Sequence, residues 1–172
     1  MSALDNQPTN PNFLSPLGFG FQIKKTPHVN YFVQSVNLPS VTMGETVLAT
    51  PFRRTPLQGD VVEYGQLQIT FRVDEDMRNY EELLLWIQSV GKFEGFPSYP
   101  GYTQTSVTGE GIVSDGVLII QNSAKQPAIQ FDIINMYPST LSDLQFDSQL
   151  SDIDYVQAIA SFNFERFTMT RI

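Results

Sequence analysis

The sequence predicts a mainly antiparallel β domain, a sandwich or barrel, with one packed α-helix and long loops. Three observations support this: 13 Phe and 7 Tyr among 172 residues, several stretches that alternate apolar and polar residues, and one stretch with helical periodicity. Aromatic residues favour the half-buried surface of a sheet, and alternation turns one face of a strand toward a core. We expect an extended N-terminal arm at residues 1–17, rich in Pro, Asn and Ser, and a single domain at residues 18–172.

The first strands are expected near the start of this domain. Phe19, Phe21 and Ile23 alternate with polar residues or glycine. A break at residues 26–28 and a second strand at about residues 30–38 complete a predicted hairpin. Residues 39–60 then lose the alternation, with three prolines and two glycines, so we expect a long excursion with room for a loose hairpin of its own. Loops of this length inside a compact domain are usually functional.

The clearest strand signal covers residues 61–73. Its residues divide between two parities: apolar Val61, Leu67, Ile69, Phe71 and Val73, and polar Gln66, Gln68, Thr70 and Arg72. One face of this strand should therefore lie in the core, and the other should meet water or a smooth cargo.

The spacing of apolar residues then changes from that of a strand to that of a helix, which predicts a helix at about residues 75–90. Met77, Tyr80, Leu84 and Ile87 recur at helical spacing. Asp74 is the expected N-cap, and Gly91 is expected to end the helix. One face of this helix should pack on the sheet.

The rest of the chain predicts further strands and a long loop. Residues 92–116 show almost no periodicity, so we expect a loop there, and strands follow at 117–121 and 129–136. Residues 138–144 suggest a short helical turn capped by Ser139. A last strand is expected at 155–172, with a bulge where the parity switches after residues 165–166.

No catalytic constellation is visible in the sequence. The chain has no cysteine and a single histidine, His28, which we place in a surface turn. Asp74, Glu75 and Asp76 are explained by helix capping, and Asp143, Asp147, Asp152 and Asp154 by a solvated loop, with a weak cation site as the alternative. We expect no enzymatic activity, no cofactor and no metal, and favour a structural or assembly role.

Net charge and hydropathy limit the classes of partner that we expect the protein to bind. The net charge is −8, from 10 basic and 18 acidic residues, which argues against a cationic clamp on nucleic acid. No run of 18 apolar residues is present, so no membrane span is expected.

The order of these features resembles the tail tube proteins of contractile-tailed bacteriophages, including the related proteins that cap or initiate the tube at the baseplate. The likeness covers about residues 18–170. It rests on four blocks in order: Gln34–Pro39 (QSVNLP), Phe71–Asp76 (FRVDED), Leu85–Ile87 (LWI) and Met136–Asp147 (MYPSTLSDLQFD).

The resemblance implies a virion structural protein that forms hexameric rings, stacked into the inner tail tube through which the genome is ejected. Its partners would be further copies of itself, the tail sheath and the baseplate, in a tail assembled in the host cytoplasm. By analogy, the excursion with Glu45, Arg53 and Arg54 is expected to contact the adjacent ring. Gln66, Gln68 and Thr70 are expected to face the lumen, where an acidic surface would let DNA pass without specific binding.

Other functions remain open at this point. One alternative is a baseplate-proximal tube initiator or hub protein of the same fold. Another, of a different class, is a carbohydrate-binding β-sandwich that uses the aromatic residues of segment 93–102. A small hydrolase that uses the aspartates lacks a paired base and a nucleophile motif.

Overall fold

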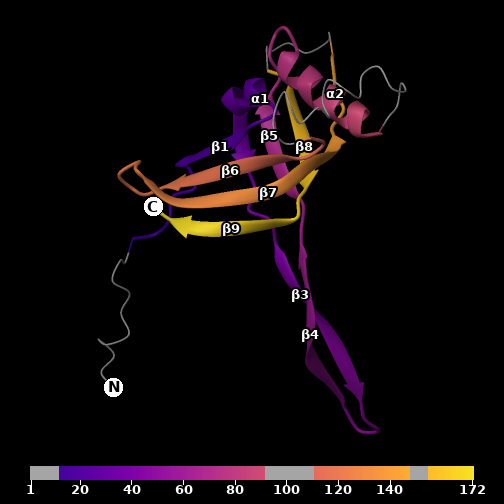
Figure 1. Ribbon diagram of the computed structural model, residues 1–172. Helices are drawn as coiled ribbons and strands as arrows, with labels where there is room; N and C mark the ends of the chain where they lie inside the picture. The colour runs from indigo at the N-terminus through magenta and orange to yellow at the C-terminus, as the bar shows by residue number, and fades with distance from the viewer. Residues whose placement is uncertain (1–11, 92–110, 148–154) are drawn as a thin grey trace.

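The computed structural model describes residues 12–91, 111–147 and 155–172 (Figure 1). These residues form nine strands and two helices. In chain order they are β1 (Phe19–Ile23), α1 (Pro27–Phe32), β2 (Val33–Val36), β3 (Val41–Ala49), β4 (Arg54–Tyr64), β5 (Leu67–Arg72), α2 (Arg78–Gly91), β6 (Ser114–Gln121), β7 (Pro127–Leu141), β8 (Gln157–Asn163) and β9 (Arg166–Arg171). The predicted mainly-β class is confirmed, and every strand pair is antiparallel.

Strand β7 joins two layers of sheet. Its first half pairs with β6 and β9, and its second half, from Tyr137 onward, pairs with β8. The order β1-β6-β7-β8-β5-β2 therefore bends at β7 into one layer of β1, β6, β7 and β9 and another of β7, β8, β5 and β2. The bend lies at Asn135, whose backbone has φ 55°.

The core fills the space between these layers. One layer contributes Phe21, Ile23, Leu118, Phe131 and Ile133, and the other contributes Leu67, Ile69, Phe71, Ala158, Ala160 and Phe162. Val29 of α1 and Leu83 and Trp86 of α2 are fully buried with them. The Trp86 and Phe162 rings lie 6.2 Å apart, which ties α2 to the sheet as the helix prediction expected. Each such burial stabilises the fold by about 1.5–3 kcal/mol.

The predicted hairpin at residues 19–38 is wrong. Residues 27–32 form helix α1, with Pro27 in its first turn, and β1 and β2 pair with β6 and β5 instead of with each other. Proline suits the first helical turn because that position needs no backbone donor. Asn30 then binds the end of β1, since its side chain accepts from the Ile23 amide at 2.8 Å and donates to the Ile23 carbonyl at 2.9 Å.

The excursion after residue 39 is a long two-stranded ribbon of β3 and β4 that projects away from both layers (Figure 1). The predicted strand at residues 61–73 is therefore two strands. Val61 belongs to β4 and is exposed, while Leu67, Ile69 and Phe71 are buried in β5 as predicted. Between them the chain turns at Gly65, whose amide donates to the Ser40 carbonyl at 2.8 Å.

Helix α2 begins at Arg78 rather than directly after Asp74, so Asp74 is not its N-cap. Residues 74–77 form a turn in which the Met77 amide donates to the Asp74 carbonyl at 2.9 Å. The buried Asn79 side chain holds this turn, because it donates to the Arg72 carbonyl at 2.8 Å and accepts from the Asp74 amide at 3.2 Å.

The C-terminal half differs from the prediction in two places. Residues 138–141 continue β7 instead of forming a helical turn, and the Ser139 hydroxyl donates across to the Ser161 carbonyl at 3.0 Å. The single last strand is two strands, β8 and β9. The parity switch at residues 165–166 thus marks a corner, where the Glu165 amide donates to Ile134 at 3.1 Å. Residues 1–11, most of the expected loop at 92–116, Asp152 and Asp154 lie outside the described residues.

Candidate functional site

His28 lies at the surface between the two helices. Its Nδ1 is 2.5 Å from the Oε1 of Glu82, so the imidazole links α1 to α2. Within residues 12–91, 111–147 and 155–172, no three His, Cys, Asp or Glu side chains gather in a way that could hold a metal ion. No helix in this part of the chain is long and apolar enough to cross a membrane.

The projecting ribbon contains the residues expected to contact an adjacent ring. Arg53 and Arg54 lie together at its tip, where the Thr50 amide donates to the Arg53 carbonyl at 3.0 Å and the Arg53 amide donates to the Thr50 hydroxyl at 3.1 Å. Glu45 pairs with Gln58 farther along the ribbon. It lies four residues from the end of β3, or about 13 Å, so the structure separates Glu45 from the two arginines.

The ribbon is also apolar, which the sequence reasoning missed. Large hydrophobic side chains are exposed along its whole length: Val41, Met43, Val47, Leu48, Phe52, Leu57, Val61, Val62 and Tyr64. Phe52 at the tip is 100% exposed. A contiguous exposed surface of this kind marks an interaction site. The signal in the sequence was the presence of apolar residues on both parities of residues 39–64, which suits a strand pair covered on both faces.

The residues expected to face the lumen lie on or beside the outer face of β5. This face continues onto the neighbouring strands through amide contacts, with Gln66 donating to Asn163 at 3.2 Å and the side-chain amides of Gln157 and Gln34 lying 2.7 Å apart. Gln66 and Gln68 are exposed on this surface, whereas Thr70 is partly buried.

This amide face contains no carboxylate. The strands β2, β5 and β8 contain no Asp or Glu, and their one charged residue is Arg72, whose guanidinium lies 3.6 Å from the centre of the Tyr155 ring. The acidic surface expected of a lumen is therefore not supplied by these three strands. Neutral amides neither attract phosphates nor repel them strongly, because they have no formal charge.

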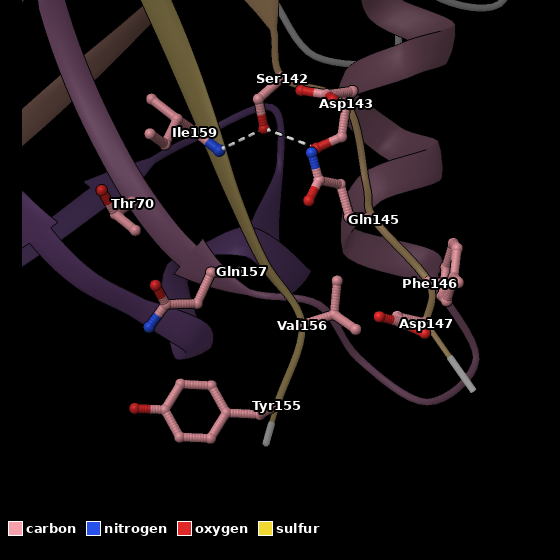
Figure 2. Close-up of a pocket in the computed structure, with 10 residues that line it drawn as sticks. All are labelled: Thr70, Ser142, Asp143, Gln145, Phe146, Asp147, Tyr155, Val156, Gln157 and Ile159. Atoms are coloured by element: carbon pink, nitrogen blue, oxygen red, sulfur yellow. Dashed lines mark hydrogen bonds between the residues drawn. The ribbon is translucent and has the colours of Figure 1, made fainter. Parts of the chain in front are cut away.

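A groove lies at the end of β5 and β8 that is nearer α2. Figure 2 shows its lining side chains: Thr70, Ser142, Asp143, Gln145, Phe146, Asp147, Tyr155, Val156, Gln157 and Ile159. Its volume is about 880 Å³. The two lining segments are joined where the Ser142 amide donates to the Ile159 carbonyl at 2.8 Å and the Ile159 amide donates to the Ser142 hydroxyl at 2.9 Å. Thr70 thus lies at the edge of this groove as well as on the amide face.

Comparison with known proteins gives a likeness in structure and none in sequence. No family model matches the chain, and no curated protein matches it. A chain in the sheath/tube terminator of an extracellular contractile injection system, PVC, aligns with a TM-score of 0.65 and 13% identity over 94% of this chain and 99% of that one. A chain in the tube terminating cap of the anti-feeding prophage aligns with a TM-score of 0.60 and 11% identity over the full length of both chains.

The protein has a tail-tube-type fold. A chain of the PVC sheath–tube complex in its extended state supports the same conclusion, with a TM-score of 0.58 and 11% identity over 94% of both chains. The resemblance inferred from the sequence is therefore confirmed as a fold.

Proposed function

We propose that this tail-tube-type protein is a non-enzymatic structural subunit that forms hexameric rings, and that the rings stack into a hollow tube inside a contractile tail. The projecting ribbon is the observation that carries the proposal. Its apolar side chains are exposed on both faces beyond the root, where the Tyr64 ring packs against Phe164 and Phe167. A second copy of the protein supplies that cover in a tube.

Unpaired strand edges support a ring. In the described residues β1, β2 and β9 each pair with one neighbour only, so each leaves one edge open. Open edges in a monomer favour uncontrolled association, whereas a closed ring satisfies them with identical neighbours. The low fraction of charged residues, 16%, is consistent with a chain that buries much of its surface against its own copies.

The amide face, which contains no carboxylate, suits a conduit. In a ring whose lumen is lined by Gln66 and Gln68, a nucleic acid meets amides that bind phosphate weakly. We propose genome ejection from a bacteriophage tail as the transport event, with sheath and baseplate proteins as further partners. The tail would be assembled in the host cytoplasm.

A role at one end of the tube is a second candidate. It is favoured by the likeness to chains in a sheath/tube terminator and in a tube terminating cap. Such a subunit forms rings but does not polymerise extensively by itself. The carbohydrate-binding alternative rests on segment 93–102, which lies outside the described residues.

Electron microscopy of the purified protein tests the proposal. We expect annuli with sixfold symmetry, and rods at higher concentration if the protein is the main tube subunit. A variant whose ribbon is shortened to a tight turn between Glu45 and Gln58, which are paired across the two strands, should form rings without rods. A protein that stays monomeric at high concentration in sedimentation experiments would contradict the ring.

A further inference from the structure

We propose that the ribbon tip of one copy docks into the groove beside α2 of a second copy in the adjacent ring. This contact rests on the proposed stacking and assigns the residues on both sides of it. The tip consists of Phe52, Arg53 and Arg54, and the groove is the one formed by residues 142–147 and 155–159 (Figure 2).

The tip has the chemistry of an interface anchor. Phe52 is completely exposed, and the two arginines beside it are exposed as well. Phenylalanine and arginine are both enriched in protein interfaces. The turn that carries them is ordered by the hydrogen bonds between Thr50 and Arg53, so little conformational freedom is lost when the tip docks.

The groove offers the complementary surface. Its apolar side chains are partly open to solvent, with exposed fractions of 74% for Phe146, 49% for Tyr155 and 47% for Ile159. Its volume of about 880 Å³ lies in the range that accommodates a drug-sized ligand, which is comparable to the side chains of a short turn.

The charges of the two surfaces are opposite. Asp143 and Asp147 line one wall of the groove, while the Arg72 guanidinium covers one face of the Tyr155 ring at its other wall, so the negative charge lies on the 143–147 side. Arg53 and Arg54 form no ion pair within the described part of the chain. Opposite charges at the rim of an apolar contact fix its register and disfavour wrong partners.

The tip and the groove lie at opposite ends of the molecule. The ribbon runs in one direction from its root at Val41 and Tyr64, and β5 runs in the other direction toward α2 (Figure 1). The groove begins at Thr70, near the far end of β5. With the tip at one end of the molecule and the groove at the other, the contact between two copies is head-to-tail. Such contacts produce open stacks rather than closed pairs.

Disulfide trapping tests the contact directly, because the wild-type chain contains no cysteine. Phe52→Cys and Ile159→Cys variants with different tags are mixed in equal amounts and oxidised. We expect a covalent heterodimer that increases with protein concentration. The control mixture pairs Phe52→Cys with Gln130→Cys, which lies on β7 in the other layer, and should give little heterodimer.

Charge reversal tests the chemistry of the contact. Arg53→Glu with Arg54→Glu should raise the critical concentration for rod growth by roughly tenfold, and Asp143→Arg with Asp147→Arg should do the same. Mixing the two variants should restore growth in part, since each then meets a complementary partner. Lys125→Glu, in the turn between β6 and β7, is the matched control and should leave growth unchanged. If the double aspartate variant does not fold, Asp143→Arg alone replaces it.

The outcomes separate this contact from the function on which it rests. A trapped heterodimer and rescue by the mixed variants support the contact. Normal rods from Phe52→Ala and from the arginine variant, with no heterodimer, overturn the contact and leave the tube function intact. Absence of rings and rods in the wild type overturns the tube function, and the trapping experiment then decides on the contact by itself.

Discussion

Gly59 of β4 lies directly against Gly44 of β3, so that a Cβ atom on Gly59 would meet the Gly44 carbonyl carbon at 2.6 Å. The contact coincides with the shift in register between Met43 and Glu45, where the ribbon has extra residues on β4. The close approach of the two backbones therefore sets how the outer half of the ribbon is aimed. An irregularity of this kind bends a strand pair and increases its twist.

Gly59→Ala should therefore abolish tube growth while leaving the domain folded. The added methyl group overlaps backbone atoms, which cannot move aside as a flexible side chain can. Because the ribbon is exposed, the thermal unfolding of the core should change little, whereas rods should disappear from electron micrographs.

Gly20→Ala is the matched control for this experiment. Gly20 is also in a strand, but a Cβ there meets no atom within 4 Å. This variant should fold and polymerise normally. Normal rods from Gly59→Ala would show that the close approach of the ribbon backbones does not direct stacking.

Phe162→Ala should be strongly destabilising. Phe162 is fully buried beneath Trp86, and removing a buried aromatic side chain costs about 3–5 kcal/mol. The measurement is urea unfolding of protein kept below the concentration at which it assembles. Leu57→Ala, at an exposed ribbon position, is the control and should change the free energy of unfolding by no more than about 0.5 kcal/mol. Equal losses in both variants would mean that the ribbon is part of the cooperative fold.

The regular spacing of apolar residues along the strands made much of the sheet predictable from the sequence. The alternation at Leu67, Ile69 and Phe71 gave the correct buried face of β5, and the helical spacing gave α2 to within three residues at its start. These elements each have one apolar face against a single core, so local pattern and tertiary environment agree.

The predictions failed where tertiary contacts decide the structure. Local spacing favoured a hairpin for residues 19–38, but the partner of β1 is β6, about 100 residues away in the sequence. The start of α2 was predicted too early, directly after Asp74. The Asn79 side chain binds the Asp74 amide and holds the preceding residues in a turn, so the helix begins only at Arg78.

The candidate site was predictable only in part. Its arginines were found because two basic residues stand out in an acidic chain. The groove was not found, because its walls come from two segments that are joined only in the folded structure, at Ser142 and Ile159.

Asn79→Ala should cost about 1–3 kcal/mol of stability, because it leaves the partly buried Arg72 carbonyl and Asp74 amide without their partner. Asn79→Asp should be at least as damaging, since a carboxylate has no donor for the Arg72 carbonyl. The measurement is the midpoint of thermal unfolding. Asn122→Ala is a less disruptive control, because Asn122 lies in the exposed turn between β6 and β7. A midpoint for Asn79→Ala equal to that of wild type would show that the turn before α2 does not depend on this side chain.

Gln68→Lys should turn a passive lumen into one that retains nucleic acid. In a hexameric ring the substitution adds six cations to a face on which the six Arg72 side chains are the existing charges, so that phosphates release more counterions when they bind. We expect rings of the variant to bind single- and double-stranded DNA with an affinity that falls steeply with salt, while wild-type rings show no binding at physiological salt.

The position of the added charge is tested with Gln130→Lys, which carries the same charge on the other layer of the sandwich. If Gln68 faces the lumen, DNA bound to Gln68→Lys rings should be protected from nuclease over a length set by the tube, and DNA bound to Gln130→Lys rings should be digested. Protection by Gln130→Lys alone would place the layer of β1, β6, β7 and β9 on the lumen and reverse the assignment. The amide face would then lie on the outside, where it would contact the sheath.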